Sequence, residues 1–89
     1  GYYGGQKYLL PGTISNFTKQ HFEKNRRGLG WDKPEPAGNG PTSDFASPNT
    51  YGHTGFTGTA VWVDPDQNLV YVFLSNRVYP EAGNNKLIK

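Results

Sequence analysis

The chain has 89 residues, two histidines and no cysteine, so it forms one domain at most, and neither a disulfide nor a structural metal site is expected. Only 34% of its residues are hydrophobic and it contains 12 Gly and 7 Pro, which predicts a small core and many loops. A net charge of +2 with dispersed Lys and Arg argues against a nucleic-acid partner, and the longest apolar run, LVYVFL, is far shorter than the roughly 20 residues of a membrane span.

The N-terminal part of the chain predicts a hairpin followed by a helix. Gly4 and Gly5 separate two short aromatic or aliphatic runs, which is typical of a hairpin turn. The period then changes, and this predicts an amphipathic helix at about residues 14–25, with Thr13 as its N-cap and Gly28 after its end. The basic run KNRRG is interpreted as a solvated helix end. The apolar side of this helix comprises Ile14, Phe17, His21 and Phe22, with His21 interpreted as a packing or helix-end residue.

Two contrasting segments follow the predicted helix. GLGWD places Leu29 and Trp31 on one face and is a candidate for a short strand, which completes a first section of residues 1–33. Residues 34–50 are rich in Pro and Gly and lack periodicity, so they predict a long loop. A loop of this length in a compact domain is usually either disordered or part of a functional site.

The clearest pattern lies in residues 51–80. TAVWV and LVYVFLSN are rich in β-branched and aromatic residues, and DPDQN between them has turn chemistry, so an antiparallel hairpin is predicted. Both faces of this hairpin are apolar, and one short helix can cover only one of them. We therefore expect an α+β fold, an antiparallel sheet with one flanking helix, whose remaining cover comes from a segment outside this chain. An apolar pattern resumes within residues 81–89.

The polar stretch HTGFTGT precedes the predicted hairpin. His53 can donate, accept or carry charge, Thr54 offers a hydroxyl, and Gly55 leaves space beside the backbone. These properties suit a substrate-binding strand edge. They equally suit a bend with a structural histidine, which is the commoner meaning of such a tripeptide taken alone.

The wider context favours the first alternative. YGHTGFTGTAVWVDPDQNLVYVFLSNR resembles the C-terminal segment of the serine β-lactamase and penicillin-binding-protein superfamily, and especially the β-lactamase-related hydrolases that include esterases and D-amino-acid peptidases. GGQKYLLPGTISNFT resembles an earlier segment of the same family. The resemblance implies that residues 1–89 are a single partial domain, the C-terminal part of a β-lactamase/transpeptidase-like fold, and that residues 81–89 are the start of a truncated terminal helix. It also implies no metal or organic cofactor and a bacterial envelope or periplasmic location.

The resemblance also implies residue roles in acyl transfer through an acyl-serine intermediate. His53, Thr54 and Gly55 take the place of the family's Lys-Thr-Gly triplet. His53 would orient substrate and support proton transfer, Thr54 would hydrogen-bond the substrate carbonyl or carboxylate, and Gly55 would leave room for the acyl group. The backbone N–H of Phe56 would be one oxyanion-hole donor. The substrate would be a small ester, amide or peptide.

Two departures from the family pattern shape this hypothesis. The chain contains no Ser-x-x-Lys and no Tyr-x-Asn, so the nucleophile is expected in an upstream part of the same polypeptide, and the chain alone is expected to be inactive. Histidine also replaces a lysine that is cationic near neutral pH, which weakens the grip on a carboxylate and favours esterase or peptidase activity over antibiotic hydrolysis.

Two alternatives remain open from the sequence. The first is a small aromatic-rich module that binds carbohydrate or peptidoglycan, and the second is a catalytically dead structural homologue. The aromatic residues that would serve such a module are Tyr2, Tyr3, Tyr8, Trp31, Tyr51, Trp62, Tyr71 and Tyr79.

Overall fold

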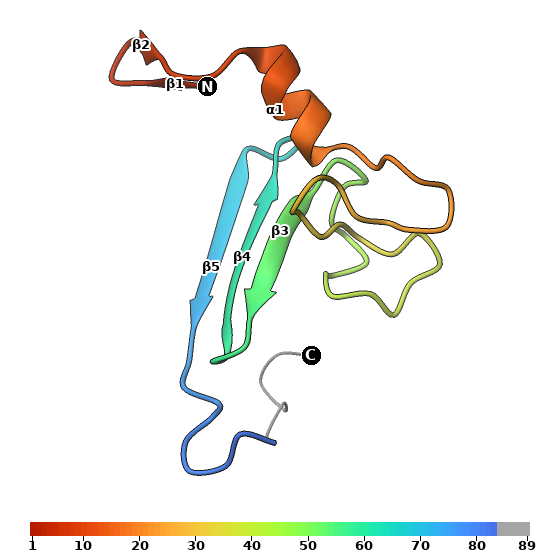
Figure 1. Ribbon diagram of the computed structural model, residues 1–89, viewed down its shortest axis with the longest axis vertical. Helices are drawn as coiled ribbons and strands as arrows, with labels where there is room; N and C mark the ends of the chain where they lie inside the picture. Colours follow the sequence, from red (N-terminus) through yellow and green to blue (C-terminus); the bar gives the residue numbers. More distant parts are fainter. Residues whose placement is uncertain (84–89) are drawn as a thin grey trace.

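The computed structural model describes residues 1–83 and contains, within them, one helix and two antiparallel sheets (Figure 1). The expected terminal helix at residues 81–89 falls largely outside this described part of the chain. The architecture is consistent with a partial β-lactamase-like fold. In chain order the elements are β1 (Tyr2–Tyr3), β2 (Gln6–Lys7), α1 (Pro11–Thr18), β3 (Tyr51–Gly55), β4 (Thr59–Asp64) and β5 (Leu69–Leu74).

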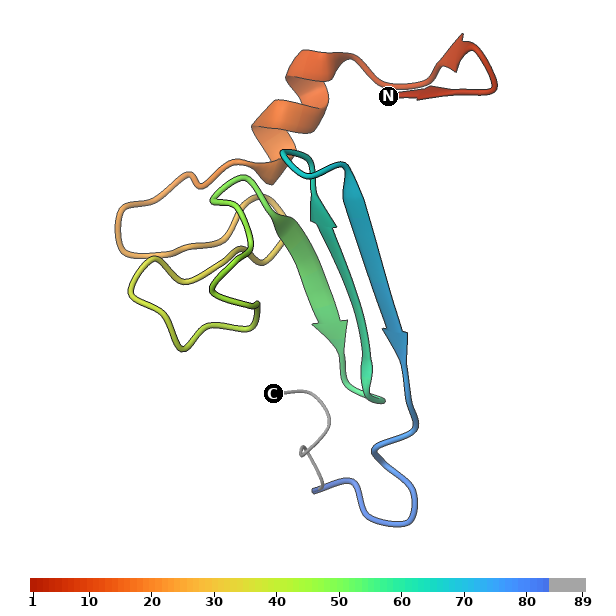
Figure 2. The same ribbon diagram turned by 180° about the vertical axis from the view of Figure 1, so that it is seen from behind.

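The N-terminal hairpin is confirmed. β1 and β2 pair antiparallel, with Tyr2 opposite Lys7 and Tyr3 opposite Gln6. Gly4 and Gly5 both have positive φ, +59° and +79°, as a two-residue hairpin turn that matches the strand twist requires. The hairpin extends away from the three-stranded sheet in both views (Figures 1 and 2).

The predicted helix bounds are wrong at both ends. α1 begins at Pro11, whose fixed φ suits the first helical position, and Leu10 rather than Thr13 is its N-cap. The helix stops because Lys19 is extended, with φ −76° and ψ 157°. The hydroxyl of Thr18 donates to the carbonyl of Ile14 at 2.8 Å, a local bond that competes with continued helix. Eight residues are helical, and the periodic pattern beyond Thr18 does not extend α1.

The residues expected on the second half of that helix lie in a loop instead. His21 places Nε2 2.6 Å from the carbonyl oxygen of Asn16, so it does serve the end of α1, but from outside the helix. Phe22 is 66% exposed and forms only an isolated bridge with Asn25. The run KNRRG is therefore not a helix end.

The three-stranded sheet has the order β3-β4-β5, with both neighbouring pairs antiparallel. This confirms the predicted hairpin and adds β3 to it. In the register, His53 is opposite Val61, which is in turn opposite Val72 of β5. Thr54 is opposite Ala60, which is in turn opposite Phe73. Because successive side chains point to opposite faces, His53 and Thr54 belong to opposite faces of the sheet.

Little of the sheet is covered within the described residues. Trp62 is the buried hydrophobic residue there, at 9% exposure. On β5, Val72 and Leu74 remain 58% and 75% exposed. Helix α1 lies beyond the end of the sheet in both views (Figures 1 and 2). Ile14 and Phe17 of α1 line a pocket together with Trp31 and Tyr51, whose ring centroids are 5.2 Å apart. The helix therefore does not cover a sheet face.

The candidate strand at GLGWD is reduced to a single bridge. Asp32 N–H donates to the carbonyl of Gly52 at 2.8 Å, and Gly52 N–H donates back at 3.1 Å. Before it, the N–H of Gly28 bonds the carbonyl of Trp31 at 2.9 Å, and Gly30 has a φ of +79°. These features close a turn, so the segment cannot run extended beside β3.

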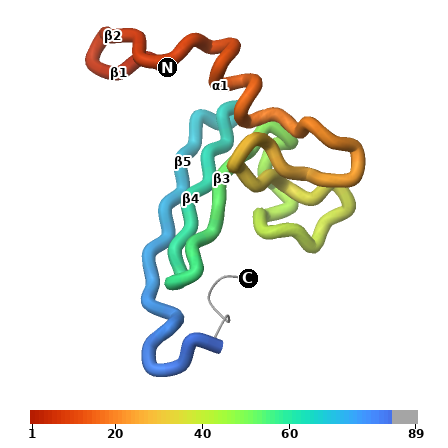
Figure 3. The backbone as a smooth tube through the Cα atoms, viewed as in Figure 1, coloured from red at the N-terminus to blue at the C-terminus, as the bar shows by residue number. Residues whose placement is uncertain are grey.

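The Pro-rich loop, residues 34–50, lies beside the β3 end of the sheet (Figure 3) and is tied to it by polar contacts. The carboxylate of Asp64 accepts hydrogen bonds from Ser47 Oγ at 2.6 Å, Ser47 N at 2.9 Å and Gln67 Nε2 at 2.7 Å. These bonds hold the pKa of Asp64 well below its ordinary value, against the opposing effect of its burial. Lys33, itself buried, donates from Nζ to the carbonyl of Thr50 at 3.1 Å. Burial lowers the pKa of Lys33.

We predict that Asp64 makes stability acid-sensitive. Its pKa is lower in the folded chain than in the unfolded chain, so its contribution is complete above about pH 4 and is lost as the pH falls through the lowered folded value. Thermal unfolding measured between pH 2 and pH 7 should show a steeper acid loss in the wild type than in Asp64→Asn. Asp44→Asn, at an exposed aspartate of the Pro-rich loop, should retain the wild-type profile. Identical acid profiles for the wild type and Asp64→Asn would show that the hydrogen bonds of the Asp64 carboxylate do not stabilise the fold.

Candidate active site at the β3 edge

The outer edge of β3 is defined by the bridge to Asp32. Gly52 directs both its N–H and its C=O to Asp32, away from β4. Backbone polar groups alternate along an antiparallel strand, so Thr54 also directs its N–H and C=O to the outer edge, whereas His53 bonds β4. No other strand pairs with this edge among residues 1–83. The edge beyond Gly52 can therefore bond an extended ligand.

His53 is exposed and held by two hydrogen-bonding partners. Its Nδ1 lies 2.6 Å from the carbonyl oxygen of Thr54, and its Nε2 lies 3.0 Å from Nη1 of Arg27. A carbonyl oxygen only accepts and a guanidinium only donates. Both bonds are satisfied together by a neutral imidazole with its proton on Nδ1.

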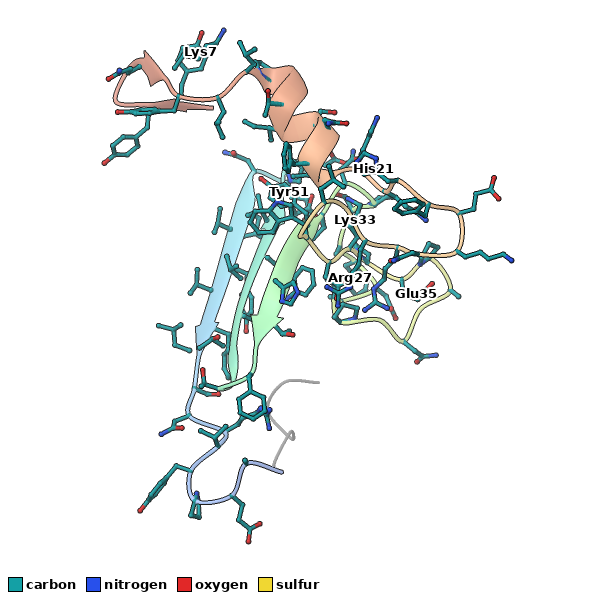
Figure 4. The ribbon with its side chains drawn as sticks, in the orientation of Figure 1. Lys7, His21, Arg27, Lys33, Glu35 and Tyr51 are labelled. Carbon is teal, nitrogen blue, oxygen red and sulfur yellow. The ribbon has the colours of Figure 1, made fainter. Side chains whose placement is uncertain are left out.

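A cluster of charged side chains lies beside His53. Asp32 accepts two hydrogen bonds from Arg26, at 2.7 and 3.0 Å, and its Oδ2 lies 3.7 Å from Nη2 of Arg27. Arg26 also reaches Glu35 at 3.5 Å. Burial by itself would raise the pKa of Asp32, but the bonds from Arg26 and from the N–H of Lys33 outweigh it, and the pKa is lowered. The bond to Asp32 in turn raises the pKa of Arg26. Figure 4 shows Arg27, Lys33 and Glu35 on the side of β3 away from β4.

Two glycines of β3 are required by close packing on β4. A Cβ at Gly52 would collide with the carbonyl oxygen of Val61 and come within 2.8 Å of the Cα of Trp62. A Cβ at Gly55 would collide with the hydroxyl of Thr59, its cross-strand partner. Gly55 therefore has a packing reason to be glycine in addition to the expected room for an acyl group.

Phe56 directly follows β3 and starts the turn of residues 56–58. Its side chain is 72% exposed, and the guanidinium of Arg77 lies over its ring at 4.7 Å. Gly58 completes the turn with a φ of +96°. The four predicted site residues, His53 to Phe56, are thus consecutive along one strand edge and its turn, with the His53 and Thr54 side chains on opposite faces.

Sequence reasoning missed Arg27 and Asp32. Arg27 was interpreted as part of a solvated helix end, yet it contacts His53, 26 positions away. No local spacing could reveal this pair, because the turn at residues 28–31 and the bridge from Asp32 to Gly52 bring it together.

Comparison with known proteins agrees with this architecture. The β-lactamase family profile matches residues 5–88, and the chain belongs to that family. Proteins named "Putative D-alanyl-D-alanine carboxypeptidase" from Salmonella paratyphi B, Salmonella newport and Salmonella heidelberg are each 40% identical over 88 residues. The match covers 98% of this chain and 20% of each relative, so the chain spans about one fifth of their length. No solved structure gives a significant match.

Among residues 1–83, no group of three or more His, Cys, Asp or Glu side chains is arranged to hold a metal ion. Nor does this part of the chain contain a helix with the length and apolar character of a membrane span.

Proposed function

We propose that this chain is the C-terminal portion of a serine hydrolase that cleaves peptides through an acyl-serine intermediate. The nucleophile belongs to an upstream part of the same polypeptide, because no serine here is followed by lysine at the third position. The chain alone is inactive. Membership of the β-lactamase family and the name of the Salmonella relatives support a peptidase rather than an esterase.

The observation that carries this proposal is the outer edge of β3 beyond Gly52, with which no other strand pairs among residues 1–83. The backbone N–H of Thr54 can bond an extended peptide as an added strand would, and its C=O, which accepts from His53 Nδ1, has a second lone pair for such a bond. His53 stands at this edge with its imidazole ordered by two hydrogen bonds. The imidazole is exposed, so a substrate bound at this edge can contact it.

The proposed roles follow from position along the edge. His53 orients the substrate and supports proton transfer, and Thr54 bonds its carbonyl or carboxylate. Gly55 leaves room for the acyl group. The backbone N–H of Phe56, the first residue of the turn after β3, is the proposed oxyanion donor. Such a donor contributes about 3 to 4 kcal/mol to transition-state stabilisation.

A serine-reactive probe tests the proposal directly. The full-length protein should become covalently labelled on a serine of an upstream Ser-x-x-Lys, and the isolated 89-residue chain should remain unlabelled. Mass spectrometry of the digested adduct locates the serine. Labelling of the isolated chain would refute the upstream nucleophile, and an upstream sequence without Ser-x-x-Lys and Tyr-x-Asn would instead support the catalytically dead homologue.

One observation favours a binding module as a second candidate. Tyr2, Tyr3 and Tyr8 in the N-terminal hairpin are 69%, 80% and 63% exposed, which suits stacking against sugar rings. Trp62 is buried and Trp31 packs on Tyr51, so neither is available for that role. Titration of peptidoglycan fragments should then perturb the NMR signals of the hairpin tyrosines, and no change at millimolar ligand would exclude this candidate.

A further inference from the structure

Arg27 has contacts that the family triplet alone does not explain. It follows Arg26 in sequence, but the two side chains have different partners. Arg26 is engaged in a two-pronged bond with Asp32 and also reaches Glu35. Arg27 bonds His53 at 3.0 Å, and its Nη2 stays 3.7 Å from Asp32, beyond hydrogen-bond distance. Its side chain is 48% exposed, compared with 32% for Arg26.

These contacts leave Arg27 with donors available at the strand edge. A guanidinium has five N–H donors, and the bond to His53 uses one of them. The carboxylate of Asp32 is mainly satisfied by Arg26 and by the N–H of Lys33, at 2.8 Å. A second carboxylate at the β3 edge could accept hydrogen bonds from the planar guanidinium of Arg27, the side-chain group that pairs best with a carboxylate.

The hydrogen bonds of His53 indicate which side chain carries the positive charge beside the triplet. With the proton on Nδ1 donated to Thr54 and Nε2 accepting from Arg27, His53 itself carries no positive charge. The cation that contacts the triplet is therefore Arg27. It comes from a different segment of the chain and is bonded to β3 through Nε2 of His53.

We infer that Arg27 is a positioning and specificity-determining residue of this site. It holds the His53 imidazole through Nε2 and pairs with the free C-terminal carboxylate of a peptide substrate. This inference rests on the proposed hydrolase function. It assigns the charge recognition at the β3 edge to Arg27 rather than to His53.

The first experiment compares two substrates of the full-length protein. One is an acyl peptide with a free C-terminal carboxylate, and the other is the same peptide with a C-terminal carboxamide. Arg27→Gln should lower kcat/KM about 10- to 100-fold on the carboxylate peptide and less than about threefold on the carboxamide. Arg27→Lys should retain a preference for the carboxylate. Lys24→Gln, at an exposed cation of the same loop, should alter neither value. Equal losses on both peptides, or no loss on either, would overturn the specificity role.

The second experiment is independent of catalysis. Nitrogen-15 NMR of histidine-labelled full-length protein at pH 8, with His53 assigned by the signal lost in His53→Gln, should show the proton on Nδ1. The Nε2 signal should shift in Arg27→Gln and stay in place in Lys24→Gln. A proton on Nε2 would overturn the positioning role, because Arg27 could not then donate to that atom. If the wild type cleaves neither peptide, the hydrolase proposal fails and the specificity role fails with it, while the NMR result decides the positioning role separately.

Discussion

His53→Ala in the full-length protein is expected to lower kcat/KM by about 100-fold while leaving thermal stability nearly unchanged. The activity should fall because His53 is the proposed group that orients the substrate at the β3 edge, and a misplaced substrate costs on the order of 10²-fold. Stability should remain because the ring is exposed and its two bonds join it to Thr54 and Arg27 at the surface. Steady-state kinetics and differential scanning calorimetry on the same preparation test both halves.

The matched control is His21→Ala, which removes the other histidine of the chain. His21 contacts the carbonyl of Asn16 at the end of α1 and lies outside β3, so this variant should keep its activity. Parallel losses of activity and stability in His53→Ala would identify a structural histidine, the commoner meaning of the motif from sequence alone.

Gly52→Ala is expected to be the most destabilising single substitution at the site, by about 3 kcal/mol of unfolding free energy. The added methyl group would strike the backbone carbonyl of Val61 and approach the Cα of Trp62, and neither backbone atom can move without disturbing the β3–β4 pairing. The bridge between Gly52 and Asp32 should weaken as well, so activity should fall together with stability. Urea unfolding of the full-length protein measures the loss.

Gly12→Ala provides the control for the loss of a glycine as such. Gly12 lies in α1 with nothing within 4 Å of its would-be Cβ, so alanine there should be neutral or stabilising by up to about 1 kcal/mol. A Gly52→Ala variant as stable as Gly12→Ala would show that β3 and β4 pack less closely than described.

The parts of the fold that could be predicted from sequence depend on short-range chemistry. Alternating β-branched and aromatic residues around DPDQN specify β4 and β5, because side-chain direction repeats every two residues in a strand. Gly4 and Gly5 specify the first hairpin turn, because its backbone needs positive φ at both positions. The family membership was likewise carried by consecutive residues of the segment 51–80.

Helix length was not predictable in this way. The apolar spacing of Phe17, His21 and Phe22 fits a helix, but α1 ends at Thr18, where the chain turns to meet the loop and sheet. Leu29 N–H bonds the carbonyl of Phe17 at 2.8 Å, so the end of the helix is bonded to a residue 12 positions later. Such a non-local bond overrides the weak preference that periodicity expresses.

The sequence by itself determined the two hairpins, their turns and the identity of the triplet His53, Thr54 and Gly55, since each depends on neighbours along the chain. The tertiary structure alone decided which cation serves the triplet. Arg27 reaches His53 across 26 positions because Asp32 pairs with Gly52 and draws the preceding turn to the β3 edge. The tertiary structure also decided that the Pro-rich loop is bonded to the sheet, because the N–H and the hydroxyl of Ser47 both donate to the carboxylate of Asp64, 17 positions away. Contacts between residues far apart in sequence leave no local pattern, since they exist only after the backbone has brought the two segments together.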